Sequence, residues 1–458
     1  MGPPRAAVRA VALGLAGRPV SRATASRREL RRETRHPHYV RRRVGVFSLL
    51  ALIVALGIYL PATLLAPVPT AAGAVTAYTA PTQASTPLEL PSYGSSGIEA
   101  VGYPTSLATG GSAAPRSIAS ISKIITALVV LQKKPLDGGN GPKITFTAAD
   151  HALYATYLAQ DGEVAPMNVG DSLTEKQVLQ VALIKSANNY AGTLALWAFG
   201  TNTAYQAAVK TFLAAHGLTH TTIVEPTGLD ARNTSIPTDL IVLGKLALAS
   251  KDIAPIVDTK QISIPNVGVV QNSNELLGID DVVGIKTGTL DDHGSNLLFA
   301  TKQTVDGHAV TLIGAVLGGK DHDTIDADIQ RMLAQVTARF HTVDAVAAGS
   351  VYGTYATPWG ATVQASTTTS VSRLVYGDVT VSGTVHLDRV GLDKAGHRVG
   401  SLEVHIGAST TTVPLVLDKA VAAPDAWWRL TNPKVTIGGY SADASAAVSR
   451  LGAFASSM

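Results

Sequence analysis

The chain has 458 residues and contains no cysteine. This excludes disulfide bonds, thiolate metal sites and a cysteine nucleophile, although it leaves the compartment open because exported proteins can also lack thiols. Charged residues are scarce, at 15%, whereas hydrophobic residues make up 46%. The sequence also has no glycine-rich phosphate loop, no internal repeat and no heptad pattern. A nucleotide-binding motif, a repeat architecture and a coiled coil are therefore not indicated.

Net positive charge is confined to the N-terminal tail, although the whole chain has a net charge of +4. Residues 1–43 hold twelve arginines and two glutamates, a net charge of +10, so the rest of the chain sums to −6. Basicity that is confined to one tail does not predict nucleic-acid binding by the folded part. No nucleic-acid partner is expected.

An uncharged run, "VGVFSLLALIVALGIYL", covers residues 44–60, and apolar residues continue it to 66. A helix needs about 17–25 such residues to cross a bilayer. Three arginines directly precede the run, so the positive-inside rule predicts a basic cytoplasmic tail at 1–43, a membrane anchor at 44–66 and an extracytoplasmic remainder. A cleaved signal peptide, with "PTAAGAVTA" as the cutting region, is the rival interpretation. The length of the basic tail favours a retained anchor in the cell membrane.

Composition divides the rest of the chain. Residues 67–95 are rich in Pro, Ala, Thr and Ser, as in an extended linker. Residues 96–347 contain strand patterns, then helical patterns, then strands again, which predicts an α+β domain with an antiparallel sheet. Residues 348–445 contain short alternating runs such as "VYGDVTVSGTVHL", typical of a small all-β domain. Residues 446–458 are predicted to be a C-terminal tail.

Local patterns predict several elements of the α+β domain. A first strand is expected at 97–103 and a helix that Ser120 opens. Further helices are expected at 203–217, 237–250 and 323–343, because apolar residues recur there at helical spacing. Strands are expected around 281–288 and in the two apolar runs that follow.

The run "IASISKIITALVVL" places Ser120 and Lys123 three residues apart at the entrance of an apolar segment. In a helix these side chains share one face. A serine is a poor nucleophile until a neighbour removes its proton. Burial, or a second cation nearby, lowers the pKa of a lysine and allows it to act as that base. Taken alone, the pair is also explained by a helix-capping serine and a lysine that reaches the solvent.

Two further motifs follow in order. "KSANNYA" contains Ser186 and Asn188, and "GIKTGTL" contains Lys286, Thr287 and Gly288. S-x-x-K, S-x-N and K-T-G in this order form the motif set of the penicillin-recognising serine enzymes. The chain resembles one branch, the D-alanyl-D-alanine carboxypeptidases of cell-wall maturation, over about residues 95–345. The stretches "EPTGLDARNTSIPTDL" and "QNSNELLGIDDVVGIKTG" carry further parts of the resemblance, and "DAWWRLTNP" is similar to part of an accessory domain in some members.

The resemblance implies a fold and three catalytic roles. The fold is the penicillin-binding, β-lactamase-like transpeptidase fold, an antiparallel sheet flanked by helices. Ser120 would form the acyl-enzyme, Lys123 would be the base for acylation, and Ser186 would relay protons.

The resemblance also implies substrate contacts. Asn188 would hold the substrate amide, and Lys286 and Thr287 would meet the terminal carboxylate. Gly288 and Thr289 continue the strand, along which the substrate backbone would pair. The backbone N–H groups of Thr289 and of the nucleophile would form the oxyanion hole.

These roles imply a serine-type D-Ala-D-Ala carboxypeptidase that removes the terminal D-Ala of peptidoglycan stem peptides. β-Lactams would be covalent inhibitors, and no cofactor or metal is implied. Transpeptidation and endopeptidase activity stay open, because they share the acyl-enzyme. So does a non-catalytic peptidoglycan-binding sensor, although the intact motifs argue against it. Asn189 and Tyr190 depart from the acidic residue and alanine of many relatives, and Thr289 is also typical of transpeptidases and β-lactamases.

Other candidate residues point less clearly to function. A class A β-lactamase would need a deacylating glutamate, but Glu225 lacks the E-x-x-L-N spacing and is interpreted as a loop residue. His216 and His220 have metal-like spacing, but a glycine interrupts the helix that they would need. His293 is expected at the surface, where it could border the cleft. Trp427 and Trp428 could bind sugar or pack the β-rich domain.

Overall fold

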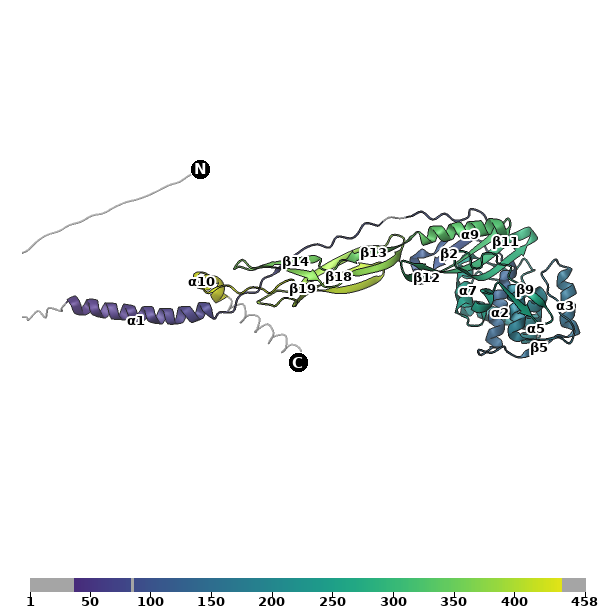
Figure 1. Cartoon of the computed structure of the whole chain (residues 1–458), viewed down its shortest axis with the longest axis horizontal. Coiled ribbons are helices and arrows are strands. Elements are labelled where there is room, and N and C mark those ends of the chain that lie inside the picture. Colours follow the sequence, from purple (N-terminus) through teal and green to yellow (C-terminus); the bar gives the residue numbers. More distant parts are fainter. Residues whose placement is uncertain (1–36, 84–85, 439–458) are drawn as a thin grey trace, which may run out of the picture. The chain divides into compact units, whose positions relative to one another are not determined.

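The computed structural model of the chain describes residues 37–83 and 86–438 (Figure 1). Most of the predicted basic tail and the predicted tail at 446–458 lie outside the described residues. The chain divides into two compact units. The first combines the residues up to Pro69 with those from Pro424 onward, and the second spans Thr70–Ala423.

In the first unit, the long helix α1 (Pro37–Leu64) contains the predicted membrane anchor. Its segment Tyr39–Leu64 is long and apolar enough to cross a membrane, and no part of the most apolar stretch of that segment is buried in protein. The short helix α10 (Ala426–Thr431) contacts its end, where Arg429 Nη1 donates a hydrogen bond to the Ala66 carbonyl over 2.8 Å. Trp427 and Trp428 lie on α10, outside the β-rich sheet, and Trp427 is 74% exposed.

The second unit contains a five-stranded antiparallel sheet in the order β10-β11-β12-β2-β3. Its strands are β2 (Ser95–Ala100), β3 (Ala108–Gly111), β10 (Val282–Leu290), β11 (Gly294–Val305) and β12 (His308–Gly319). Short pairs add β4 (Arg116–Ser117) with β7 (Thr234–Ser235), β5 (Lys143–Thr145) with β6 (Ser172–Thr174), and β8 (Gln261–Ile264) with β9 (Gly268–Gln271). Strands from both ends of the segment meet in one antiparallel sheet, which confirms the α+β prediction.

The helices of this domain are α2 (Ser122–Lys133), α3 (Ala148–Leu158), α4 (Glu175–Ile184), α5 (Asn188–Phe199), α6 (Asn202–Ala215), α7 (Pro237–Ala249), α8 (Ile253–Val257) and α9 (His322–Thr337). Helices α7, α8 and α9 contact the five-stranded sheet. Single turns of 3-10 helix occur at Pro104–Ser106, Ala119–Ile121 and Asp291–His293. Thr147 and Thr174 begin α3 and α4 with capping boxes, which satisfy N–H groups that a helix start leaves free.

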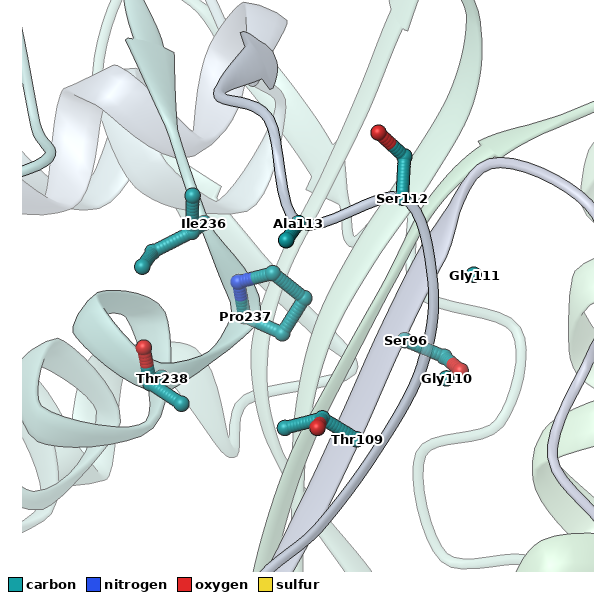
Figure 2. Close-up of a pocket in the computed structure, with 9 residues that line it drawn as sticks. All are labelled: Ser96, Thr109, Gly110, Gly111, Ser112, Ala113, Ile236, Pro237 and Thr238. Atoms are coloured by element: carbon teal, nitrogen blue, oxygen red, sulfur yellow. The ribbon is translucent and has the colours of Figure 1, made fainter.

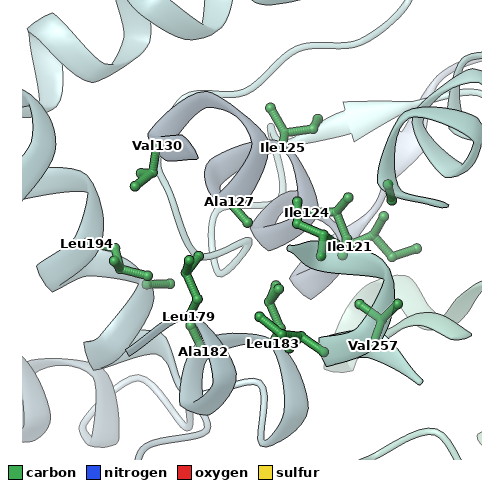
Figure 3. Packing of buried hydrophobic residues seen from close by; sticks show 14 of the residues in the cluster. Ile121, Ile124, Ile125, Ala127, Val130, Leu179, Ala182, Leu183, Leu194 and Val257 are labelled. Atoms are coloured by element: carbon green, nitrogen blue, oxygen red, sulfur yellow. The ribbon is translucent and has the colours of Figure 1, made fainter. Parts of the chain in front are cut away.

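Helix α2 lies in the core of this domain, which explains why it is apolar on every side. Figure 3 shows its side chains facing those of α4, α5 and α8; the labelled residues are Ile121, Ile124, Ile125, Ala127, Val130, Leu179, Ala182, Leu183, Leu194 and Val257. Burying each isoleucine contributes about 1.5–3 kcal/mol. The helix is thus held firmly, and with it the position of its first turn.

The structure differs from the sequence prediction at 323–343. Helix α9 ends at Thr337, and Phe340–Val346 forms strand β13, which pairs with β16 (Val371–Tyr376). The alternating, β-branched residues of this segment suit a strand once a partner is available, a tertiary contact that local periodicity does not show.

The β-rich region forms a six-stranded antiparallel sheet in the order β1-β14-β15-β19-β18-β17. Its strands are β1 (Gly73–Val75), β14 (Val351–Ala356), β15 (Thr362–Thr367), β17 (Val381–Leu387), β18 (Arg398–Ile406) and β19 (Ser409–Leu417). Strand β1 comes from the segment predicted as a linker, and Ala71 also pairs with Val390. Part of that segment is therefore a sheet edge and not a free tether.

Candidate active site

Ser120 lies in a 3-10 turn, Ala119–Ile121, that leads directly into α2. Its side chain is partly exposed, whereas Lys123 on the first turn of α2 is only 1% exposed. The Lys123 Nζ lies 2.7 Å from the Ser120 Oγ and 2.7 Å from the Thr227 carbonyl oxygen, to which it donates. The lysine therefore does not reach the solvent: it is buried against the hydroxyl of the predicted nucleophile.

The surroundings of Lys123 favour its neutral form. Its pKa is well below the ordinary lysine value, first because burial disfavours the ammonium and then because the charge of Lys286 is close. The carboxylates of Glu225 and Glu163 oppose this shift. The neutral amine has the lone pair that a general base needs, and the nearest acidic proton is on Ser120.

The K-T-G motif lies on β10, next to the turn that carries Ser120. Lys286 is 2% exposed, and its amine donates to the Thr287 carbonyl over 3.1 Å. Burial lowers the pKa of Lys286 to about 7. Gly288 packs so closely on the Ser120 turn that a Cβ there would lie 2.8 Å from the Ile118 carbonyl oxygen and 3.1 Å from the Ser120 nitrogen. The glycine thus allows β10 to lie directly against the nucleophile.

The S-x-N motif lies in the short connection between α4 and α5. Ser186 adopts φ +67° and is 5% exposed, and Asn188 begins α5. The Asn188 backbone N–H donates to the Glu163 carbonyl over 2.7 Å, and its buried Oδ1 has no protein partner among the described residues. Glu163 acts electrostatically on both Lys123 and Lys286. The connection therefore lies next to Glu163, whose charge acts on both lysines, and Asn188 has a free amide acceptor.

The segment from Glu225 to Asn233, to which the sequence assigns no catalytic role, contacts Lys123 and the turn that carries Ser120. The Thr227 carbonyl accepts a hydrogen bond from the Lys123 amine. The Glu225 carboxylate accepts a hydrogen bond from the Thr227 N–H over 2.7 Å. Gly228 has φ +92° and abuts the Ala119 carbonyl, so only a residue without a Cβ fits there. The run "EPTGLDARN" is the sequence signal that could have identified this support.

A cavity of about 290 Å³ adjoins the end of β10. Its lining combines polar and apolar side chains: Gln160, Asp161, Leu229, Thr289, Leu290, Asp291, Asp292 and His293. His293 is exposed there, as expected, and it borders the cavity. The Thr289 Oγ1 lies 2.8 Å from the His322 Nε2, a contact that the sequence did not indicate.

Another cavity, of about 150 Å³, contains none of the predicted site residues. It lies where α7 begins beside β2 and β3, and Figure 2 shows Pro237 and Thr109 in its lining. The two histidines with metal-like spacing, His216 and His220, are both exposed.

Comparison with known proteins agrees with this geometry. The family model described as D-alanyl-D-alanine carboxypeptidase (peptidase S11) matches residues 106–321. A D-alanyl-D-alanine endopeptidase of Pseudomonas aeruginosa is 30% identical over 236 residues, which cover 48% of this chain and 71% of that protein. A D-alanyl-D-alanine endopeptidase of Escherichia coli is 34% identical over 137 residues, but the match spans only 30% of this chain and 40% of that protein.

Solved structures show the same fold. The D-alanyl-D-alanine carboxypeptidase DacD from Francisella tularensis superimposes with a TM-score of 0.51 at 17% identity, and the match covers 76% of this chain and 97% of that one. Penicillin-binding protein 5 from Haemophilus influenzae also gives 0.51 at 17% identity, with 75% and 100% covered. The predicted penicillin-binding fold is confirmed, and the chain belongs to the D-alanyl-D-alanine carboxypeptidase family of serine peptidases.

Proposed function

We propose that the chain is a serine D,D-carboxypeptidase that removes the terminal D-Ala from peptidoglycan stem peptides through an acyl-enzyme on Ser120. The observation that carries the proposal is the 2.7 Å contact between the buried Lys123 amine and the Ser120 hydroxyl, next to a K-T-G strand. Membership of the carboxypeptidase family supports the substrate class.

Acylation follows from the positions of these groups. The neutral Lys123 amine takes the proton of the Ser120 hydroxyl while the Oγ attacks the carbonyl carbon between the last two D-alanines. The oxyanion is stabilised by backbone N–H groups of Ser120 and Thr289, at about 3–4 kcal/mol per donor. The C–N bond then breaks as the leaving amine receives a proton, which Ser186 relays. Water hydrolyses the ester by the reverse proton transfers.

The substrate carboxylate is assigned to Lys286 and Thr287. In the empty site the pKa of Lys286 is about 7, because burial disfavours its charge. A carboxylate next to the amine stabilises the charged form. Substrate binding therefore favours the ammonium. The proposed role of Asn188, to accept a hydrogen bond from the substrate amide, is supported by its amide oxygen, which has no protein partner among the described residues.

D,D-endopeptidase activity is a second candidate, because the relatives from Pseudomonas aeruginosa and Escherichia coli both carry that name. It uses the same acylation but expels a cross-linked stem instead of free D-Ala. The β-lactamase alternative has less support, since both oxygens of Glu225 already accept hydrogen bonds from its own loop. That carboxylate is not free to activate a deacylating water.

A membrane location completes the proposal. Helix α1 is apolar enough to span the bilayer, and the arginines before it favour a cytoplasmic N-terminus by the positive-inside rule. The catalytic domain would then face the cell wall, where it would contribute to wall maturation and be open to β-lactams.

The test uses the purified full-length chain. Ser120→Ala should abolish both covalent labelling by a fluorescent penicillin and D-Ala release from diacetyl-Lys-D-Ala-D-Ala. Labelling that persists in this variant would contradict the proposal. Mass spectrometry of the products from this peptide and from a cross-linked stem dimer separates carboxypeptidase from endopeptidase activity.

A further inference from the structure

Five hydrogen-bond donors converge on the carboxylate of Glu225, which lies in the loop before β7. The Oε2 accepts from the Thr227 N–H at 2.7 Å and the Thr227 hydroxyl at 2.6 Å. The Oε1 accepts from the backbone N–H groups of Gly228 and Asp230 and from the Asn233 amide at 3.0 Å. Few side chains could gather this set, because only a carboxylate offers acceptors alone.

The backbone groups that donate hydrogen bonds to Glu225 belong to the same residues that contact the turn carrying Ser120. The Thr227 carbonyl accepts the Lys123 amine at 2.7 Å. The adjacent Gly228 packs so tightly that a Cβ on it would lie 2.8 Å from the Ser120 nitrogen. The loop therefore contacts both members of the proton-transfer pair.

Two more hydrogen bonds tie the same loop to α2. The Thr126 hydroxyl donates to the Pro226 carbonyl over 2.8 Å, and the Asn233 amide donates to the Ser122 hydroxyl over 3.0 Å. The loop is thus attached to α2 on the turn that carries Lys123 and on the next turn. Movement of the loop would change the surroundings of that lysine directly.

We propose that Glu225 is a positioning residue for acylation: by gathering the loop, it fixes the Thr227 carbonyl as the acceptor that aims Lys123 at Ser120. This inference rests on the proposed function. A carbonyl oxygen can only accept, so one N–H of the amine always faces Thr227. The lone pair of the neutral amine is then directed away from that bond, and the Ser120 hydroxyl lies 2.7 Å from the same nitrogen.

Glu225 has a second, electrostatic effect on the same lysine. The charged groups that act on Lys123 are Lys286, which lowers its pKa, and Glu225 and Glu163, which raise it. Removing either glutamate charge should therefore move the acidic limb of the acylation profile to lower pH. Only Glu225 also holds the loop, since Glu163 pairs through its side chain with Lys185.

This difference provides a matched control. Glu225→Gln removes the charge and introduces an amide donor among five donors. Glu163→Gln removes a charge and an ion pair with Lys185, but no contact to the loop. The experiment measures the second-order rate constant of acylation by a fluorescent penicillin between pH 5 and 10, on the full-length chain. A misplacement of about 1 Å can cost about 100-fold in rate, so the pH-independent rate of Glu225→Gln should fall roughly 10- to 100-fold.

We expect three distinct patterns. Glu225→Gln lowers the maximal acylation rate and moves the acidic limb to lower pH. Glu163→Gln moves the acidic limb, and also the basic limb of Lys286, to lower pH and keeps the maximal rate. Thr227→Val removes the hydroxyl bond to Glu225 but no charge, so its plateau should fall about 3- to 10-fold with the limb unmoved. If Glu225→Gln does not fold, the acylation rate of Thr227→Val tests the positioning role of Glu225 in its place.

The inference is overturned if folded Glu225→Gln, or Thr227→Val in its place, keeps a plateau within about twofold of wild type. Thermal melting of each variant identifies the folded ones. A wild-type chain that no penicillin acylates would instead contradict the proposed function itself, which keeps the two failures apart.

Discussion

At the scale of single residues, two buried lysines determine what the site can do. Lys123 and Lys286 are 1% and 2% exposed, and burial lowers the pKa of both. Their proposed tasks are opposite: Lys123 would act as a base only when neutral, and Lys286 would bind a carboxylate best when charged. The pH range of activity should therefore have a separate limb for each lysine.

The pH dependence that Lys286 causes should appear in KM, because this residue is proposed to bind the substrate carboxylate. Because burial lowers its pKa to about 7, the amine loses its charge in the empty site as the pH rises through neutrality. We expect KM for diacetyl-Lys-D-Ala-D-Ala to increase about 10-fold per pH unit above this range. Steady-state kinetics from pH 6 to 9 measure this, with Lys286→Met as the control that should have a high KM at every pH. A KM that stays constant in the wild type would contradict the assignment.

Sequence reasoning located these residues but not their supports. The three motifs identify Ser120, Lys123, Lys286 and their neighbours because each motif has a fixed local spacing. The role of Thr227 is not visible in the same way, since its backbone carbonyl contacts Lys123 and any residue type has a carbonyl. Backbone contacts between distant segments depend on the tertiary fold.

At the scale of elements, the site depends on the close approach of strand β10 to the turn Ala119–Ile121. The glycine of K-T-G makes this approach possible, because a Cβ there would lie 2.8 Å from the Ile118 carbonyl oxygen. The strand also carries the proposed oxyanion donor Thr289. A small separation of the two elements should therefore impair acylation more than folding.

Gly288→Ala tests this approach. The added methyl group must push β10 from the nucleophile, so we expect acylation by a fluorescent penicillin to slow roughly 100-fold. Gly139→Ala is the matched control, because its Cβ would meet its nearest neighbour, the Leu136 carbonyl oxygen, at an ordinary 3.4 Å. Equal acylation rates in the two variants would show that the contact is not critical.

Helix α4, which leads to Ser186, begins with a buried acid. Glu175 is 0% exposed, neither of its oxygens has a hydrogen-bond partner among the described residues, and burial raises its pKa to about 7. The folded chain thus keeps a proton that the unfolded chain loses at about pH 4.3. Stability from this group is complete below that pH and is lost as the pH rises through about 7.

Glu175→Gln should therefore stabilise the chain at pH 8, by about 1–3 kcal/mol, and have little effect at pH 4. Urea denaturation at the two pH values measures the difference. Glu89→Gln, at an exposed position, is the control and should change neither value. A gain of the same size at both pH values would show that ionisation of Glu175 is not the cause.

The element boundaries also show what the sequence can predict. Local spacing and end signals predict helices at 203–217 and 237–250, where α6 and α7 occur. The helix predicted at 323–343 is too long, since α9 ends at Thr337. The residues after it form β13, whose partner β16 lies about thirty residues further along the chain, and local spacing does not show such a pairing. Strand β1 is not predicted for the same reason, since its partner β14 is distant in sequence.

At the scale of the whole molecule, the chain has one unit with an apolar helix and another with all the predicted site residues. The residues of α1 that face outward include Leu52 and Leu56. The site residues lie between Ser120 and Thr289, within Thr70–Ala423. A long uncharged run is apparent without any knowledge of the fold, so composition predicts the apolar helix. It does not predict that the residues from Pro424 onward join the unit of that helix.

Substitution of α1 tests membrane attachment separately from catalysis. A lysine near the centre of a membrane helix costs about 2.5–3.5 kcal/mol. The double variant Leu52→Lys and Leu56→Lys should therefore shift the chain from the membrane to the soluble fraction, with penicillin labelling per molecule unchanged. Leu52→Phe with Leu56→Phe should stay in the membrane. A lysine variant that also stayed there would contradict the anchor.

The central claim is that a lysine made neutral by burial activates Ser120. Its most direct test is the pH dependence of the acylation rate constant for wild-type chain and a penicillin. The account predicts an acidic limb governed by a group whose pKa lies well below the ordinary lysine value. A rate that keeps rising tenfold per pH unit up to about pH 10.4, as for an ordinary lysine, would contradict it.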